Sequence, residues 1–166
     1  MQISKSAVTI LGIDPGIAST GYGVVKKVGK TVMCVEYGVI TTKPVESAPR
    51  RLKKIFSGVN RLVRAYHPQV AAVEQIFFAK NVKTAFAVGQ ARGVILLALG
   101  STIKTIAEYS PLQVKQTMVG YGKADKRQVQ KMVRLHLSMK ELPSPDDAAD
   151  ALAVALCWAF DTQQHL

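Results

Sequence analysis

The sequence predicts an α/β fold in which a five-stranded mixed sheet, an antiparallel meander plus parallel strands, is flanked by helices. Three observations predict it. Three strand-like segments follow one another closely at the start of the chain, two more apolar strand segments are separated by helical patterns, and two strands run directly into an acidic residue. The 166 residues suffice for one domain with its own core, so we expect residues 1–166 to form a single domain.

The first predicted strand is the apolar run from Ile10 to Ile13, which suits a strand covered on both faces. Asp14 follows it directly, and Pro15-Gly16 then forms a turn. The segments Thr20–Lys27 and Thr31–Thr41 complete the meander. Asp14 therefore lies at the carboxyl end of a strand, where open α/β sheets place their ligands. Asp before Pro-Gly is also ordinary turn chemistry, so this segment alone leaves both readings open.

A long helix is predicted after Ser47, because apolar residues recur along one face while arginines and lysines occupy the rest. That basic surface is either a solvated face or a binding site. His67-Pro68 ends the helix, and the apolar strand Val70–Val73 then runs into Glu74, as the first strand runs into Asp14. Glu74 cannot be explained as a surface residue of an alternating strand, since its strand is apolar on both sides.

The helix predicted from Val82 to Leu99 is almost wholly uncharged and has Gly89 and Gly93 four residues apart. Such a helix must be buried, either under the sheet or in a subunit interface. Ile103–Ala107 is the fifth predicted strand. Two shorter helices are expected after it, one opened by Ser110-Pro111 and one capped by Asp125.

The last predicted helix combines acids at its start with an apolar body. Ser144 and Asp147 have the spacing of a capping box, with Pro145 at the first helical position. Capping accounts for Asp147 but not for Asp150. All ten residues of Ala151–Phe160 are apolar, so the helix is expected to be buried nearly all round, with Asp147 and Asp150 on one side of it.

Composition indicates the kind of partner. The chain has 22 Lys and Arg against 11 Asp and Glu, a net charge of +11, which favours a polyanion and makes nucleic acid the first candidate. No stretch suits a membrane span and no secretory leader is evident, so we expect a cytoplasmic protein without a membrane partner. Cys34 and Cys157 lie far apart, outside any zinc motif, and are expected to be reduced core residues.

The isolated acids need compensation, since an unpaired buried carboxylate costs several kcal/mol. Salt bridges are one explanation, although the flanking apolar segments contain no basic residue. If Asp14, Glu74, Asp147 and Asp150 instead converge, neighbouring carboxylates about 4 Å apart would repel by roughly 4 kcal/mol, and divalent cations would remove that repulsion. Oxygen-only ligands select Mg²⁺ or Mn²⁺ over zinc. An acidic metal site in a basic protein indicates phosphodiester hydrolysis.

Seven ordered blocks of the chain resemble the RuvC family of bacterial Holliday junction resolvases, within the ribonuclease H-like superfamily. They are Leu11-Gly12-Ile13-Asp14-Pro15-Gly16, Thr20-Gly21-Tyr22-Gly23, Glu74-Gln75 with Phe77, Ala79-Lys80-Asn81, Gly89-Gln90-Ala91-Arg92-Gly93, Val114-Lys115-Gln116 and Asp147-Ala148-Ala149-Asp150-Ala151-Leu152-Ala153. The resemblance runs from about Ile10 to Trp158.

The resemblance implies a homodimeric endonuclease that nicks two strands of like polarity in a four-way DNA junction, in recombination and repair. It implies two Mg²⁺ ions per active site, with Mn²⁺ as a substitute, and a branch-migration complex of RuvA and RuvB as partner. The implied site residues are the catalytic and metal-binding Asp14, Glu74, Asp147 and Asp150, the DNA-binding Phe77, Lys80, Lys115, Lys126 and Arg127, and Gly89 and Gly93 in the dimer interface. Asp146 is expected to be a spectator at a helix N-terminus.

Other functions are compatible with parts of the pattern. A non-catalytic junction or RNA binder would have no reason to keep four isolated acids. An actin-like kinase fold needs two such domains, and this chain has the length for one. An RNA-processing nuclease of the same fold is the nearest alternative, and the shape of the preferred substrate would distinguish it.

Overall fold

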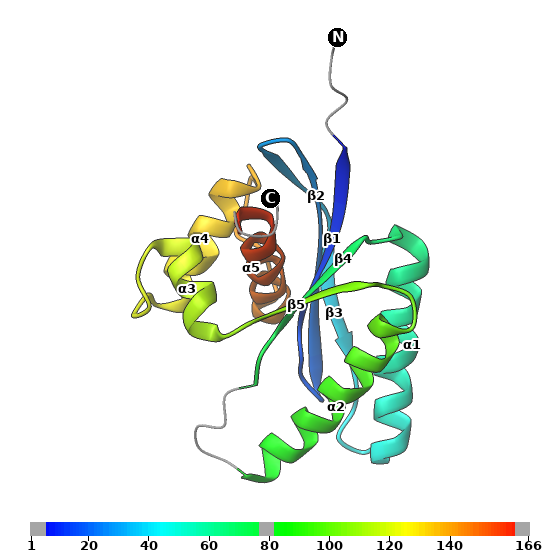
Figure 1. Ribbon diagram of the computed structural model, residues 1–166. Coiled ribbons are helices and arrows are strands. Elements are labelled where there is room, and N and C mark those ends of the chain that lie inside the picture. The colour runs from blue at the N-terminus through cyan, green and yellow to red at the C-terminus, as the bar shows by residue number, and fades with distance from the viewer. Residues whose placement is uncertain (1–5, 77–81, 162–166) are drawn as a thin grey trace.

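A computed structural model describes residues 6–76 and 82–161. Its centre is the predicted five-stranded sheet, with the order β3-β2-β1-β4-β5 (Figure 1). Strands β1 to β3 pair antiparallel as the meander, and β4 and β5 continue from β1 in parallel. The strands are β1 (Ala7–Asp14), β2 (Ser19–Val28), β3 (Thr31–Thr41), β4 (Val70–Glu74) and β5 (Thr105–Tyr109). The predicted fold class is therefore confirmed.

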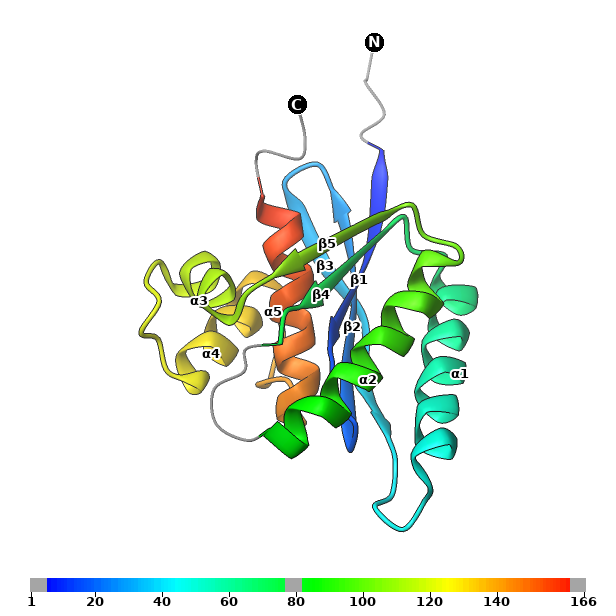
Figure 2. The ribbon, with the colours of Figure 1, turned by 60° about the horizontal axis from the view of Figure 1, so that its bottom comes forward.

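Helices cover both faces of the sheet. The helices α1 (Ala48–Tyr66) and α2 (Val82–Gly100) pack on one face, whereas α5 (Asp146–Phe160) lies on the other, with α3 (Pro111–Val119) and α4 (Lys126–His136) outside it (Figure 2). Alternation along β1 produces the two cores. Ile10 belongs to the cluster around α5, while Leu11 and Ile13 pack with α1 and α2.

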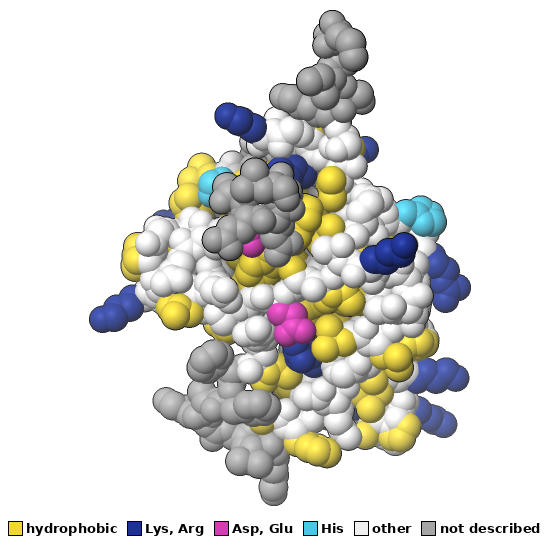
Figure 3. Space-filling model, viewed as in Figure 1, with side chains coloured by type: hydrophobic (Ala, Val, Ile, Leu, Met, Phe, Trp, Pro, Cys, Tyr) yellow, Lys and Arg dark blue, Asp and Glu magenta, His cyan; other side chains and the backbone are white. Residues whose placement is uncertain are grey.

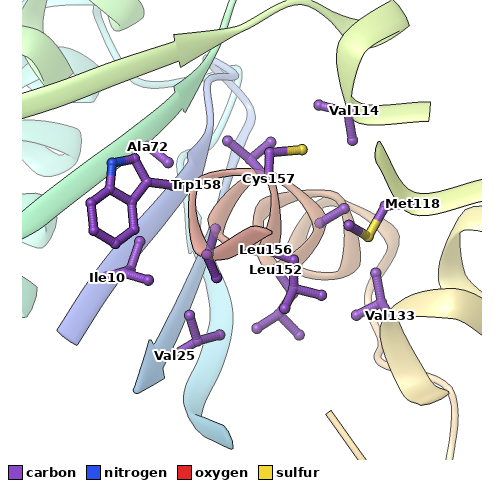
Figure 4. Packing of buried hydrophobic residues seen from close by; sticks show 14 of the residues in the cluster. Ile10, Val25, Ala72, Val114, Met118, Val133, Leu152, Leu156, Cys157 and Trp158 are labelled. Carbon is purple, nitrogen blue, oxygen red and sulfur yellow. The ribbon is translucent and has the colours of Figure 1, made fainter. Parts of the chain in front are cut away.

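The helix α5 is buried as its composition predicts. Every residue from Ala151 to Ala159 is buried, and Leu152, Leu156 and Trp158 pack among side chains of the strands (Figure 4). Close approach to the sheet depends on Gly12, because a Cβ there would lie 2.1 Å from the carbonyl oxygen of Ala151. The position of α5 is therefore fixed by backbone contact as well as by side-chain packing.

Two helix starts follow the predicted capping chemistry, and one does not. Ser110 and Asp125 each form a capping box with a glutamine three residues later. The capping box predicted for Ser144 and Asp147 is wrong. Pro145 occupies the N-cap of α5, so Ser144 lies one residue too early, and no side chain caps this end. The carboxylate of Asp147 is consequently not used for capping.

The almost wholly uncharged helix α2 is buried on one face only. Ala91, Ile95 and Leu99 are buried against α1 and the sheet, whereas Phe86 is 71% exposed and Leu97 65% exposed. The strand predicted from Ile103 instead begins at Thr105, because the N–H of Ile103 still bonds the carbonyl of Leu99 at the end of the helix. In the described ranges, no helix combines the length and hydrophobicity needed to cross a membrane. Cys157 is buried, Cys34 is half-buried, and both are free thiols.

Candidate active site

Asp14 and Glu74 lie side by side because they end two neighbouring parallel strands. Ile13 is in register with Val73, so the next residue of each strand is an acid. Two residues earlier, Gly12 packs on α5 and Ala72 belongs to the core around α5, so alternation turns both acidic side chains toward that helix. The carboxyl groups of Asp14 and Glu74 lie within hydrogen-bonding reach of each other. The sheet thus supplies one half of an acidic site.

The N-terminal part of α5 supplies the other half. Gly21, which pairs with Asp14 across the meander, packs against the backbone of Asp147, and a Cβ on Gly21 would lie 1.9 Å from the Asp147 carbonyl oxygen. Carboxylate oxygens of Asp14, Asp147 and Asp150 all lie within 4.8 Å of one another. Glu74 joins this cluster through its contact with Asp14. The four predicted acids therefore converge.

Burial and mutual repulsion strongly perturb these carboxyl groups. Burial, followed by repulsion from Glu74, Asp150 and Asp147, raises the pKa of Asp14 to about 8. Burial also raises the pKa of Glu74, and the positive charges of Lys126 and Lys115 oppose the rise. The pKa of Asp150 is raised mainly by burial, against the effect of Lys126. Without a counterion, Asp14 and Glu74 cannot both ionise readily at neutral pH.

Salt bridges explain only one of the buried acids. Lys126, at the start of α4, lies 2.9 Å from an Asp150 oxygen and 3.3 Å from Asp146. Burial lowers the pKa of Lys126, but the bonds to these two carboxylates outweigh it and the net change is upward. Within residues 6–76 and 82–161, no cation lies within ion-pairing distance of Asp14, Glu74 or Asp147. Salt bridges therefore leave most of the site's negative charge uncompensated.

The donor set fits a hard divalent cation. All candidate ligands are carboxylate oxygens, and those of Asp14, Asp147 and Asp150 are mutually close enough to share an ion. A cation there would relieve the repulsion that, after burial, raises the pKa of Asp14. Beside them is a cavity of about 240 Å³ lined by Glu74, Asp150, Lys115 and Lys126, among others. Anionic and cationic groups thus meet in one recess at the carboxyl edge of the sheet.

The remaining predicted residues differ in what the structure reveals. Phe77 and Lys80 lie outside the described residues. Arg127 is exposed on α4, beside Lys126. Gly89 and Gly93 have no atom within 4 Å of where a Cβ would be, so the described part of the chain does not use their small size.

Sequence reasoning missed two residues that support the site. Gly21 sets the distance between β2 and the Asp147 backbone, and its signal was a glycine inside a strand. Gln130, one helical turn after Lys126 on α4, donates a 2.8 Å hydrogen bond to Asp146, and no pattern in the sequence singles it out. Asp146 itself is exposed, and its carboxylate bonds Lys126 and Gln130 on α4.

Fold and site together define a metal-dependent nuclease of the ribonuclease H-like class, because a cluster of carboxylates at the carboxyl edge of this sheet stands beside lysines in a strongly basic chain. Comparison with known proteins identifies the family within this class. The family model described as "Crossover junction endodeoxyribonuclease RuvC" matches residues 10–158. The chain therefore belongs to the RuvC family.

Individual relatives agree with this assignment. A crossover junction endodeoxyribonuclease RuvC from Rubrobacter xylanophilus is 53% identical over 157 residues, which cover 95% of this chain and 88% of the relative. The structure of Thermus thermophilus RuvC matches with a TM-score of 0.87 at 38% identity, over 95% of this chain and 97% of that one. The same protein in complex with a Holliday junction substrate matches with a TM-score of 0.89, over 95% and 96%.

Proposed function

We propose that this chain resolves four-way DNA junctions by paired, symmetric nicks in strands of like polarity, as a cytoplasmic single-domain nuclease of homologous recombination and DNA repair. The observation that carries the proposal is the convergence of Asp14, Asp147 and Asp150, with Glu74 against Asp14, in a protein of net charge +11. The relative from Thermus thermophilus is described in complex with a Holliday junction substrate. That relative supports the choice of a junction over linear DNA.

The four converging acids share the role of metal ligands. Asp14, Glu74, Asp147 and Asp150 would hold two Mg²⁺ ions, for which Mn²⁺ substitutes. When bound, such ions supply activation of the attacking water and stabilisation of the leaving oxygen. The carboxylates provide fixed negative charge on both sides of the site, two from strand ends and two from one helix turn. Asp146 is exposed and points to α4, so it stays outside this set.

Cations near the acids would position the DNA. Lys115 and Lys126 line the cavity next to Glu74 and Asp150, where they can bind the backbone phosphate on either side of the cut. Arg127, next to Lys126 on α4, adds a third positive charge to Lys115 and Lys126. Phe77 and Lys80 follow β4 in the chain. By family resemblance, we assign Phe77 to stacking on bases at the crossover, with Lys80 binding phosphate.

We further propose that the protein acts as a homodimer through α2. A junction with two equivalent cuts calls for two equivalent sites related by a two-fold axis. Support comes from the exposed apolar side chains Phe86 and Leu97 and from the open space around Gly89 and Gly93, which permits close approach of a second helix. Association with RuvA and RuvB is part of the proposal by resemblance to the family.

The experiment is cleavage of a labelled synthetic four-way junction beside a linear duplex of the same sequence, with Mg²⁺ or with EDTA. We expect paired nicks in the junction alone, dependent on metal. Asp150→Asn should abolish cleavage while Asp146→Asn, its matched control one helical turn earlier, should retain it. Equal cleavage of linear duplex or RNA would favour an RNA-processing nuclease instead.

One further variant separates binding from cleavage, and a light-scattering measurement tests the dimer. Phe77→Ala should keep junction binding and lose most cleavage, and a wild-type rate would remove the stacking role. Light scattering at micromolar concentration should give a dimer. A monomer that still makes paired nicks would contradict the proposed two-fold arrangement.

A further inference from the structure

A second concave surface lies away from the acidic site, between the end of β3 and the first half of α1. We call it the α1 groove. It has a volume of about 780 Å³, and the charged residues that line it are Arg50, Lys53, Lys54, Arg61 and Glu46. Its floor is formed where Gly58 lets α1 approach Ile40, because a Cβ at Gly58 would lie 2.7 Å from that side chain. The groove is therefore lined by four basic side chains and one acidic side chain.

The cations form one continuous stripe along α1. Arg50, Lys54, Ser57 and Arg61 follow each other at intervals of four, three and four residues, which keeps them on one face of a helix, and Lys53 flanks them. The buried face, with Ile55, Val59 and Leu62, lies elsewhere on the helix. From Arg50 to Arg61 the stripe is about 16 Å long, the axial length of roughly five base pairs of DNA. Lys and Arg side chains project along this side of the molecule in Figure 3.

Most of this charge has no ion-pair partner among the residues that the structure describes. Glu46 pairs with Lys54, and its other oxygen accepts the backbone N–H of Lys43 at 2.8 Å. In the described part of the chain, Arg50, Lys53 and Arg61 make no ion pair with any carboxylate. Like charges three or four residues apart destabilise a helix, so folding alone gives no reason to gather them. A polyanionic ligand would remove their repulsion.

The groove lies at the same end of the sheet as the acidic site. Asp14 is in register with Gly21, and Gly21 with Val39, which lines the groove. Two strand spacings, roughly 10 Å, therefore separate the backbones of Asp14 and Val39 along this end of the sheet, with the acids on the α5 face and the groove on the α1 face. Figure 1 shows the start of α1 near the end where β1 finishes. DNA that passes from the acidic site around this end of the sheet would meet the α1 groove.

The groove also stays open if α2 forms a dimer. α1 packs beside β3, whereas α2 reaches β5 through the ion pair of Arg92 with Glu108. These two strands are the opposite edges of the sheet. A second copy on the exposed face of α2 would lie on the β5 side, and the α1 groove would remain accessible.

We propose that the α1 groove is a second DNA-binding site, which holds the phosphodiester backbone of a junction arm outside the crossover. This inference rests on the proposed function for the identity of the DNA. The contact is with phosphates through Arg50, Lys53 and Arg61, so it adds affinity and orients the arm without reading its sequence. Cleavage of the phosphodiester bond takes place at the acidic site, and the groove only binds DNA.

The test is junction binding by full-length protein in EDTA, measured by fluorescence anisotropy from 50 to 300 mM NaCl, with anionic vesicles as a second probe. The variant is Arg50→Gln/Lys53→Gln/Arg61→Gln. Its matched control is Lys26→Gln/Lys30→Gln/Lys104→Gln, which removes the same charge from exposed lysines at the other end of the sheet. Losing three phosphate contacts should reduce the slope of log affinity against log salt by about 3 and weaken binding about tenfold or more at 0.1 M.

The control variant should keep a slope close to wild type. Equal slopes for the two triple variants would overturn the proposal. So would unchanged junction binding with lost binding to phosphatidylserine vesicles, which would assign the groove to a membrane surface.

A second measurement does not depend on the triple variant folding. A photo-crosslinker on Ser57→Cys, which is exposed within the groove, should reach DNA roughly three to eight base pairs from the crossover, whereas one on Lys30→Cys should not. Crosslinks confined to the crossover, or equal from both positions, would contradict the assignment.

Failure of the proposed function gives a different result. With Mg²⁺ and saturating protein, wild type and the control variant Lys26→Gln/Lys30→Gln/Lys104→Gln should nick the junction at the same rate. Absence of nicking in both would refute the nuclease function and leave the binding comparison intact.

Discussion

Replacing Gly21 with alanine perturbs the metal site through the backbone, without touching an acid. The glycine packs against the start of α5, and an added Cβ would lie 1.9 Å from the carbonyl oxygen and 2.4 Å from the carbonyl carbon of Asp147. Contacts below 3.0 Å essentially never occur for real Cβ atoms, so β2 and the first turn of α5 must move apart by about 1 Å. Asp147 and Asp150 would move with it, away from Asp14 on the sheet.

The size of the effect follows from that displacement. A misplacement of about 1 Å in a catalytic array can cost roughly 100-fold in rate. Overpacking of this kind costs about 1–3 kcal/mol in stability, which lowers the melting midpoint of a domain this size by roughly 2–12 °C. Gly21→Ala should therefore remain folded at 25 °C while junction cleavage falls about 100-fold and Mn²⁺ binding weakens.

Assays of cleavage, Mn²⁺ titration and thermal melting test this together. Ile55→Val is a matched control, since it removes one buried methylene from the opposite core at a cost of about 0.5–1.5 kcal/mol and leaves α5 in place. Its cleavage rate should stay near wild type. A Gly21→Ala protein with cleavage within threefold of wild type, or a rate loss equal to that of Ile55→Val, would refute the backbone argument.

Three more predictions concern charge and capping. The raised pKa of Asp14, about 8, means that the folded metal-free protein binds a proton more tightly than the unfolded chain, so its melting midpoint should fall as pH rises from about 4 to 8. Asp14→Asn should flatten that profile in EDTA, and an unchanged slope would contradict the assignment. Lys126→Met should raise the pKa of Asp150 and move the acidic limb of the cleavage profile to higher pH, whereas Lys131→Met on the same helix should not. Ser110→Ala removes a side-chain cap and should cost about 1 kcal/mol, while Ser47→Ala, where no cap bond exists, should be nearly neutral in thermal melts.

Most of the fold could be predicted because local pattern and tertiary structure agree. Buried runs such as Ile10–Ile13 and Val70–Val73 became neighbouring parallel strands, and the acids that end them met as expected. The all-apolar body of α5 required burial and is buried. These features are local consequences of hydrophobicity and strand alternation, which the sequence displays directly.

The two errors concern the exact residue at which a helix or a strand begins. Ser144 was expected to cap α5, but Pro145 occupies the N-cap, so the hydroxyl is one position too early. The strand predicted at Ile103 starts at Thr105 because the chain after α2 first completes a hydrogen bond to Leu99. Helix ends are set by hydrogen bonds between nearby backbone groups, and hydrophobic patterns do not specify them.

The sequence allowed the convergence of the four acids to be predicted, but not the residues that contact and position them. The ion pair of Lys126 with Asp150 joins α4 to α5, two helices whose contact depends on the path of the intervening chain. Gly21 acts on Asp147 across 126 positions of sequence through a backbone contact. Such contacts depend on tertiary packing, so they become visible only when the elements are assembled.

The two halves of the acidic site differ in how their charge is balanced. Asp150 has Lys126 beside it, and Asp147 sits in the first turn of a helix, where the backbone dipole favours negative charge. Asp14 and Glu74 end strands, which have almost no net dipole, and they touch each other. The pKa of Asp14 is accordingly raised to about 8. Binding of a divalent cation should therefore release its proton from the strand side of the site, and metal affinity should increase with pH until Asp14 is ionised.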